Sequence, residues 1–411
     1  MNKHFGNTIL ILGAGFALAL SACQTQPGAG STPTPRPLPT TPAPLERNLT
    51  VLWTLQTGAA IWGSPALEAG VVYIGSDDGK LYAVSAENGQ PLWEFVTKGI
   101  IRSRPALGGG LVYISSDDGF LYAVDAKDGQ QAWSADIGNF LEQQERVDLG
   151  TSTAPTGFDY FQSSPVVAGD LVYVGSFDGN VYALSAKEGQ LAWKFATGDK
   201  VRASPTVDDG TLYIGSWDKF FYAIDAQSGK MLWKTNLNGQ VQSDALVAKG
   251  KVYCASREAS VYALDAQTGE VKWSYSYGKN MWVESSPLLV DGTIYIGSSG
   301  NRAVYGLQSE NGTVRTMFSS SAFHWSTPLQ VNDAVYIGGV GFQDPENSGL
   351  YALTLEGQKL PVHKADWRLL PVKNTLEFSG DWAGVAGSPI ESGDVIYFGA
   401  LDGNLYAVKD Q

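Results

Sequence analysis

Short segments of alternating apolar and polar residues recur along most of the chain, from about residue 48 onward. One unit reads SPVVAGDLVYVGSFDGNVYALSAKEGQLAWKF at 164–195, and a closely similar unit follows 40 residues later at 204–235. Alternation over four to eight positions, bounded by glycine-containing turns, predicts β-strands. A period of 40 residues built from such strands is typical of a propeller or a solenoid.

Tyrosine occurs at two positions of the repeated unit, and each position is found eight times, which indicates eight units. The first series is Tyr73, Tyr113, Tyr173, Tyr213, Tyr253, Tyr295, Tyr336 and Tyr397, and the second is Tyr82, Tyr122, Tyr182, Tyr222, Tyr262, Tyr305, Tyr351 and Tyr406. Within a unit we expect one strand after a Ser-Pro pair, two strands that contain the tyrosines, and a fourth that carries a tryptophan. The sequence therefore predicts an all-β, eight-bladed β-propeller with four-stranded blades over residues 47–411.

A tryptophan occupies the same slot of the fourth strand in six units. A flat aromatic side chain at one slot per unit predicts a structural wedge that docks between neighbouring blades. The six positions are Trp53, Trp93, Trp133, Trp193, Trp233 and Trp273.

The two ends of the repeated region complement each other. The last unit stops at Gln411 after its third strand, and the first strand of the region, 50–55, contains Trp53 but lacks the other three strands. We predict that this N-terminal strand supplies the outer strand of the last blade. Such closure joins the ends of the ring and removes two exposed strand edges.

The first 46 residues have a different character. An apolar run from about residue 8 to 20, roughly 13 residues long, is too short for a membrane-spanning helix and is typical of a signal peptide. It ends in Leu-Ser-Ala-Cys at 20–23, which resembles the bacterial lipobox and implies cleavage before Cys23 and lipidation of its thiol. An ordinary secretory signal with a chance cysteine is the alternative. We assign 1–22 to a lipoprotein signal peptide and 23–46, with seven prolines, to a lipidated cysteine and an extended tether.

Charge and composition exclude several classes of partner. Twenty-eight Lys and Arg face 41 Asp and Glu, a formal net charge of −13, which argues against nucleic acid as the main partner. The same charge argues against attachment to anionic lipid through basic patches. Two cysteines, Cys23 and Cys254, form no disulfide framework, and three histidines leave little for a histidine-based metal site. We predict no metal site.

The pattern Ala-x-Asp-x-x-Thr-Gly-x-x-x-Trp is complete at 263–273. With the repeats, it resembles the pyrroloquinoline quinone (PQQ) repeat family, whose fold is an eight-bladed propeller. This family includes quinoprotein dehydrogenases, sensor ectodomains and BamB-type lipoproteins of the outer-membrane β-barrel assembly machine. The chain lacks the adjacent cysteine pair of the large quinoprotein alcohol dehydrogenases, and no motif matches their calcium ligands or catalytic aspartate.

The resemblance therefore implies a non-catalytic, lipid-anchored, extracytoplasmic scaffold or binding module with a protein partner, with BamB-like outer-membrane protein assembly as one role. The anchor would lie in the outer membrane if the cell has one, and otherwise on the outer face of the cytoplasmic membrane. The alternative is a PQQ-dependent oxidoreductase or a quinone- or carbohydrate-binding protein, with PQQ as its cofactor or a small molecule as its ligand.

One face of the predicted ring carries residues that vary from unit to unit. The slot three residues before each proline position should surround one mouth of the central channel, and it holds Trp62, Arg102, Gln162, Arg202, Gln242, Glu284, Trp325 and Ala386. The turns between the second and third strands open on the same face and hold Asp77, Asp117, Phe177, Trp217, Arg257, Ser299 and Leu401. This variation indicates either a solvated rim or a recognition surface, for which Trp and Arg are suited. As candidate partner or ligand contacts we select Trp62, Arg102, Gln162, Arg202, Trp217, Arg257, Glu284 and Trp325.

Two insertions interrupt the regular spacing of 12 residues between the tryptophan slot and the next proline position, such as Trp193 to Pro205. The distance is 32 residues from Trp133 to Pro165, and 28 residues from an equivalent slot at Pro361 to Pro389. We expect both insertions to join a fourth strand to the next first strand and to lie on the channel-mouth face.

Overall fold

The computed structural model describes residues 49–138, 162–258, 260–278, 283–342, 348–354, 368–371 and 382–410. The signal peptide, the tether and Cys23 lie outside these residues, as does most of the first insertion, 139–161. In the described part of the chain no helix has the length and apolar character needed to cross a membrane.

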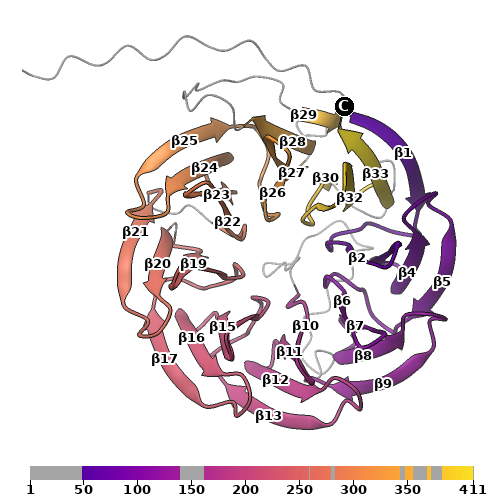
Figure 1. The fold of residues 1–411 in the computed structure, drawn as a ribbon, viewed down its shortest axis with the longest axis horizontal. Helices are drawn as coiled ribbons and strands as arrows, with labels where there is room; N and C mark the ends of the chain where they lie inside the picture. Colours follow the sequence, from indigo (N-terminus) through magenta and orange to yellow (C-terminus); the bar gives the residue numbers. More distant parts are fainter. Residues whose placement is uncertain are drawn as a thin grey trace, which may run out of the picture. The chain divides into compact units, whose positions relative to one another are not determined.

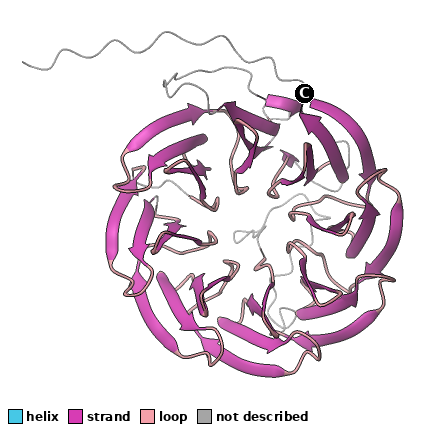
Figure 2. Ribbon diagram, viewed as in Figure 1, coloured by secondary structure: helices cyan, strands magenta, loops and turns pink. Residues whose placement is uncertain are grey.

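Eight antiparallel sheets follow one another along the chain and stand around a central axis (Figures 1 and 2). In each blade the first strand lies nearest the centre of the ring and the fourth lies on the outside (Figure 1). Seven blades use consecutive strands, and the eighth combines strands from both ends of the described chain. These observations confirm the predicted all-β, eight-bladed propeller.

The first four blades have nearly identical strand lengths. The first contains β2 (Ala66–Glu68), β3 (Val71–Gly75), β4 (Lys80–Ser85) and β5 (Pro91–Val96). The second contains β6 (Ala106–Gly108), β7 (Leu111–Ser115), β8 (Phe120–Asp125) and β9 (Gln131–Asp136). The third contains β10 (Val166–Ala168), β11 (Leu171–Gly175), β12 (Asn180–Ser185) and β13 (Leu191–Ala196). The fourth contains β14 (Thr206–Asp208), β15 (Thr211–Gly215), β16 (Phe220–Asp225) and β17 (Met231–Asn236).

The other four blades follow the same order with more variation. The fifth contains β18 (Leu246–Ala248), β19 (Lys251–Ser256), β20 (Ser260–Asp265) and β21 (Val271–Ser276). The sixth contains β22 (Leu288–Val290), β23 (Thr293–Ser298), β24 (Ala303–Gln308) and β25 (Val314–Ser319). The seventh contains β26 (Leu329–Val331), β27 (Ala334–Phe342), β28 (Gly349–Thr354) and β29 (Arg368–Pro371), with β30 (Trp382–Gly384) paired to β27. The eighth contains β31 (Ile390–Ser392), β32 (Val395–Gly399), β33 (Asn404–Asp410) and β1 (Leu49–Gln56).

The N-terminal strand closes the ring as predicted. Strand β1 pairs antiparallel with β33, from Leu49 opposite Asp410 to Gln56 opposite Asn404. Just beyond the strand, the Thr57 backbone N–H and hydroxyl group both donate to the Gly403 carbonyl oxygen, each at 2.8 Å. The last blade therefore depends on residues from both ends of the propeller.

Each tryptophan of the fourth strand lies on a turn of the next blade. The Trp193 indole Nε1 donates to the Ala226 carbonyl oxygen at 2.8 Å, and Gly229, at a φ of +70°, lies beneath the ring. A Cβ at Gly229 would come within 2.7 Å of the indole, so both the backbone angle and the close approach require glycine. Equivalent hydrogen bonds of 2.9 to 3.0 Å join Trp53 to Ala86, Trp93 to Ala126, Trp133 to Ala186, Trp233 to Ala266 and Trp273 to Ser309.

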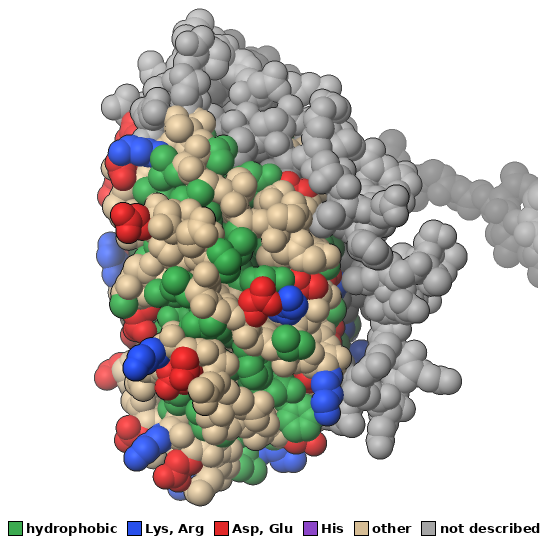
Figure 3. All heavy atoms as spheres, turned by 90° about the vertical axis from the view of Figure 1, so that its right-hand side faces the viewer, with side chains coloured by type: hydrophobic (Ala, Val, Ile, Leu, Met, Phe, Trp, Pro, Cys, Tyr) green, Lys and Arg blue, Asp and Glu red, His purple; other side chains and the backbone are tan. Residues whose placement is uncertain are grey.

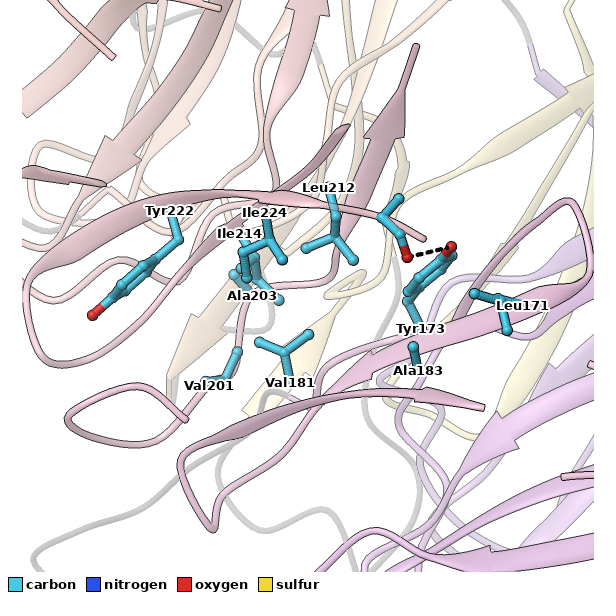
Figure 4. Packing of buried hydrophobic residues seen from close by; sticks show 11 residues of the cluster. Leu171, Tyr173, Val181, Ala183, Val201, Ala203, Leu212, Ile214, Tyr222 and Ile224 are labelled. Atoms are coloured by element: carbon cyan, nitrogen blue, oxygen red, sulfur yellow. Dashed lines mark hydrogen bonds between the residues drawn. The ribbon is translucent and has the colours of Figure 1, made fainter. Parts of the chain in front are cut away.

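Apolar side chains fill the space between neighbouring blades. Between the third and fourth blades, Val181, Leu212 and Ile214 are at most 1% exposed. Figure 4 shows these side chains packed together, with the Tyr173 hydroxyl donating to the Ala226 carbonyl oxygen at 3.1 Å. Similar clusters lie between the other blades, so the hydrophobic core is a ring of inter-blade layers.

The outer strands form a wall on which apolar and charged side chains are interspersed. Figure 3 shows this wall on the side of β1 and β5. Leu92 is 53% exposed and Val96 64%, and the Lys80 ammonium lies 2.6 Å from the Glu94 carboxylate between them. Charged side chains on an outer edge strand disfavour pairing with another chain.

The seventh blade departs from the predicted repeat. We placed its fourth strand near Pro361, but the fourth strand is β29, which pairs with β28. No tryptophan occupies the slot at Pro361, so the spacing alone could not locate this strand. The chain from 355 to 367 therefore joins the third strand to the fourth. The prediction that the whole second insertion follows the fourth strand is wrong.

Candidate functional site

The loops that lead into the first strands meet at the centre of the ring. The slot three residues before each proline position contributes one residue from every blade to the lining of a single cavity of about 90 Å³. We call this set the mouth ring: Trp62, Arg102, Gln162, Arg202, Gln242, Glu284, Trp325 and Ala386. Trp217 and Arg257, which we selected from the turns, do not line the cavity. Trp217 contacts Arg202 of the mouth ring, and Arg257 contacts Glu284.

Seven of the eight mouth-ring residues are buried and Gln162 is half-buried, which differs from what we expected of either a solvated rim or a recognition surface. Arg202 is 4% exposed, Arg102 7% and Trp325 8%. Eight loops converge on a narrow channel, and several of these side chains pack against the turn of the preceding blade. The residue type at the mouth slot therefore varies partly because each residue contacts a different neighbour on the preceding blade.

A charge pair joins the first and second blades. The Arg102 guanidinium donates from Nε to Asp77 Oδ1 at 2.9 Å and from Nη2 to Oδ2 at 2.8 Å. Its central carbon lies 5.1 Å from the centre of the Trp62 ring. Two parallel hydrogen bonds are a strong arrangement for arginine and carboxylate. Arg102 is therefore held by a carboxylate of the protein itself.

An amide joins the second and third blades. The Gln162 side-chain oxygen accepts the backbone N–H groups of Arg102 at 3.0 Å and Ser103 at 3.1 Å, and its amino group donates to Asp117. Burial raises the pKa of the Asp117 carboxyl, whereas the Arg102 charge and the Gln162 hydrogen bond act in the opposite direction. These contacts fix the orientation of the Gln162 amide.

Arg202 lies against two aromatic faces. Its guanidinium carbon lies 3.9 Å from the centre of the Trp217 ring and 4.3 Å from that of Phe177, so turns from the third and fourth blades enclose the cation. Arg257 approaches Trp217 as well, at 5.4 Å. Such contacts stabilise a cation more strongly when water is excluded. Trp217 thus serves two arginines.

A second charge pair joins the fifth and sixth blades. Arg257 Nη2 lies 3.5 Å from Glu284 Oε1, and the Ser299 hydroxyl donates to Oε2 at 3.2 Å. Burial raises the pKa of the Glu284 carboxyl, and the Arg257 charge acts in the opposite direction. Glu284 is therefore held by neighbours on the same face.

The remaining sector of the mouth is aromatic. The Trp62 and Trp325 rings are stacked, with centroids 6.2 Å apart and an interplanar angle of 23°. Phe323 stacks on Trp325 at 6.0 Å. Ala386 and Leu401 belong to the same buried cluster. The mouth thus has a charged sector in the second to sixth blades and an apolar sector, with the stacked aromatic rings, in the seventh, eighth and first.

A second ring of residues lies two positions further along each loop and lines the same cavity. We call it the hydroxyl ring, and it contains Ser64, Arg104, Ser164, Ser204, Asp244, Ser286, Thr327 and Ser388. Backbone N–H groups donate to side-chain oxygens of the next blade: Arg104 to Ser164, Ser164 to Ser204, Ser204 to Asp244, Asp244 to Ser286, Thr327 to Ser388 and Ser388 to Ser64, at 2.7 to 3.1 Å. These bonds link the inner ends of the blades.

Sequence reasoning missed the two charged members of the hydroxyl ring, Arg104 and Asp244. The Ser-Pro pair marks the start of each first strand, and the units that lack it are not among the candidates selected from the sequence. Alignment of the units shows Arg104-Pro105 and Asp244-Ala245 at positions where five other units carry Ser-Pro. This departure from the repeat is the feature of the sequence that could have identified Arg104 and Asp244 as candidate site residues.

Other groups that carry chemistry elsewhere are structural here. Within the described ranges, no group of three or more His, Cys, Asp or Glu is placed to hold a metal ion. Cys254 is fully buried, and burial raises the pKa of its thiol. His324 Nε2 lies 2.7 Å from the Ser320 hydroxyl and Nδ1 2.9 Å from the Gly338 carbonyl oxygen, and burial lowers the pKa of this imidazole to about 4. Neither Cys254 nor His324 lines the cavity.

A family profile with the description outer membrane protein assembly factor BamB matches residues 46–195, 142–221 and 177–411. The chain belongs to this PQQ-repeat family. Membership supports a propeller with a scaffold or protein-binding role. Among curated proteins, none matches the sequence.

Two solved structures share the fold of this family member. The crystal structure of BamB from Moraxella catarrhalis has a TM-score of 0.63 and 16% identity, and the match covers 88% of this chain and 97% of that one. The crystal structure of the computationally designed Ika8 protein has a TM-score of 0.65 and 13% identity, over 87% of this chain and 99% of that one. At these identities the likeness concerns the fold alone, and a designed protein shares it, so function has to be argued from the residues.

Proposed function

We propose that the protein is a lipid-anchored, extracytoplasmic scaffold that binds other proteins during outer-membrane protein assembly. The observation that carries this proposal is the match to the BamB family profile, whose segments together extend from residue 46 to 411. The lipobox-like sequence that ends in Cys23 supports attachment through a lipid. Residues 23–46 would hold the propeller away from the membrane surface.

The inter-blade contacts support a rigid platform. The mouth ring, the hydroxyl ring and the tryptophan wedges tie neighbouring blades together at both the inner and outer ends. A rigid surface loses little conformational entropy on binding, which favours affinity for a partner.

Capture of partners tests the assembly role. Full-length protein with a C-terminal affinity tag would be purified from detergent-solubilised membranes of the cells that produce it, and bound proteins identified by mass spectrometry. We expect a component of the outer-membrane β-barrel assembly machine to co-purify at a reproducible ratio. Recovery of the tagged protein without any such component would contradict the proposed role.

The anchor is tested separately by labelling with a fatty-acid analogue. Cys23→Ala should abolish incorporation of the label and release the protein from membranes. Cys254→Ala removes the other cysteine, which is buried, and should leave labelling unchanged. Membrane attachment of the Cys23→Ala variant after washing would exclude lipid as the sole anchor.

For the alternative, a quinone-dependent oxidoreductase, we propose that the channel does not serve as a quinone site. Sites for ligands of this size usually enclose roughly 300–1,000 Å³, and the cavity here is about 90 Å³. Arg102 is held by Asp77, and Trp62 and Trp325 stack on each other, so the described residues do not fit a planar tricarboxylate. Saturable quenching of tryptophan fluorescence by PQQ, together with dye reduction by an alcohol or sugar, would overturn this.

A further inference from the structure

Two opposite charges replace hydroxyl groups in the hydroxyl ring, in the second and fifth blades. The structural task of this ring is to accept a backbone N–H from the neighbouring blade, which serine performs at Ser204 and Ser64. Arginine has donors and no acceptor, so Arg104 cannot perform this task for the first blade. Asp244 does accept the Ser204 N–H at 2.7 Å, but a serine hydroxyl would suffice. The ring itself therefore gives no reason for either charge.

Both charged groups line the cavity. The Arg104 residue is exposed, whereas Asp244 is half-buried. Neither forms an ion pair with any residue that the structure describes, although six other carboxylates outside the mouth ring do. The two groups influence each other: burial raises the pKa of Asp244, and the Arg104 charge acts in the opposite direction. A charge in this position needs water or a ligand to solvate it.

The cavity between them suits a small polar molecule. One water needs roughly 10–15 Å³ of such space, so a cavity of about 90 Å³ holds about six to nine waters, or a ligand of similar size. Its wall contains serine hydroxyls and Gln242, which is 5% exposed. Gln242 Oε1 is a buried acceptor with no hydrogen-bond donor among the described residues. Besides the charged mouth-ring members Arg102, Arg202 and Glu284, the lining thus contains the cation of Arg104, the anion of Asp244 and the unmatched acceptor of Gln242.

We propose that this cavity binds a small zwitterion, an ammonium carboxylate such as a short amino acid. Arg104 pairs with the carboxylate, for which the planar guanidinium is suited. Asp244 and Gln242 accept hydrogen bonds from the ammonium group. The site is separate from the protein-binding role proposed above, because the groups that hold the ligand, Arg104, Asp244 and Gln242, are not among the candidate partner contacts selected from the sequence.

The binding test uses full-length protein in detergent and isothermal titration calorimetry. Glycine, β-alanine and 4-aminobutyrate serve as probes, because their charged groups are separated by successively longer spacers. Acetate and methylammonium each carry one of the two charges and serve as control ligands. We expect one ammonium carboxylate to bind saturably at one site per protein, at least about tenfold more tightly than either control ligand, since a charge-assisted hydrogen bond is worth at least that factor.

Variants that restore the repeat give matched controls. Arg104→Ser and Asp244→Ser introduce the residue that most other blades carry, so we expect both to fold and both to weaken binding at least about tenfold. The charge swap Arg104→Asp with Asp244→Arg should bind more tightly than either serine variant. The ligand would then bind in the opposite orientation, with its ammonium group at residue 104. If a serine variant does not fold, Arg104→Lys and Asp244→Asn replace it in the same assay.

Three results would overturn the proposal. One is the absence of saturable binding for all three ammonium carboxylates. Another is equal affinity for acetate or methylammonium. The third is unchanged affinity in both serine variants. None of these results depends on capture of an assembly component, so the site and the scaffold role can fail independently.

Discussion

The outer tryptophan positions and the mouth ring hold neighbouring blades together in opposite ways. On the outside, six tryptophans make the same hydrogen bond to the next blade and pack on the same turn glycine. At the mouth, the chemistry changes from junction to junction, with a bidentate ion pair at Arg102, an amide at Gln162 and an aromatic enclosure at Arg202. A position that varies between the units of a repeat protein is therefore not always a binding residue. It can instead form a contact that is specific to one pair of neighbouring blades.

The largest effect should follow loss of the strand that carries the first tryptophan. A chain that begins at residue 58 lacks β1, which pairs with β33 along its whole length, and Trp53, which docks on the first blade. The eighth blade then exposes an edge. We expect a lower unfolding temperature and a broader transition, measured by circular dichroism, than for a chain that begins at residue 47. Equal transitions for the two chains would show that closure contributes nothing to stability.

Next in size is the effect of breaking the buried pair at the mouth. Arg102→Ala leaves the Asp77 carboxylate buried without its guanidinium, and removal of one partner from such a pair costs about 3–5 kcal/mol. Urea unfolding followed by fluorescence measures this change. The double variant Arg102→Ala with Asp77→Ala should be more stable than Arg102→Ala alone, because it no longer buries an unpaired carboxylate. The exposed Lys127 provides the control, because Lys127→Ala should change stability by less than about 0.5 kcal/mol.

A tryptophan of the outer set should matter slightly less than that pair. Trp193→Ala removes packing against Gly229 and Tyr173 and the bond to Ala226, at a cost of about 3 kcal/mol, near the lower end for tryptophan because the ring is half-buried. Trp193→Phe keeps much of the packing and loses the hydrogen bond, which is worth about 1 kcal/mol. Equal losses for the two variants would assign the effect to the hydrogen bond alone.

The sequence predicted what repeats and missed what does not. The eight blades, the tryptophan wedge and ring closure follow from spacing, because several copies show the same pattern. Spacing also identified the mouth slot, but a slot does not show which side chains pair, so the contact of Arg102 with Asp77 was not foreseen. In the seventh blade no tryptophan marks the expected slot, and the fourth strand was misplaced. The charges of Arg104 and Asp244 were overlooked because both lie at the Ser-Pro slot, which served only to mark the start of the first strand.

The smallest effect concerns a position where an apolar repeat is broken beside the mouth ring. The residue before each mouth slot is apolar in the other blades, as at Val201 and Val241, and is His324 in the seventh. Burial lowers the pKa of the His324 imidazole from 6.5 to about 4, so between these values the unfolded chain binds more protons than the folded one. Stability must then fall as the pH falls through this window, by about 2 kcal/mol between pH 7 and pH 5 for this group.

His324→Val restores the residue of the other blades and should remove this part of the pH dependence. The variant loses its contacts with Ser320 and Gly338, so we expect it to be less stable than the native chain at pH 7. The difference in the free energy of unfolding between the native chain and the variant should be smaller at pH 5. The reason is that only the native chain loses the contribution of a neutral buried imidazole. Urea unfolding at four pH values between 5 and 7 measures both curves. Parallel curves would mean that His324 accepts a proton in the folded protein as readily as in the unfolded chain, and the exception to the repeat would then have no effect on the pH dependence of stability.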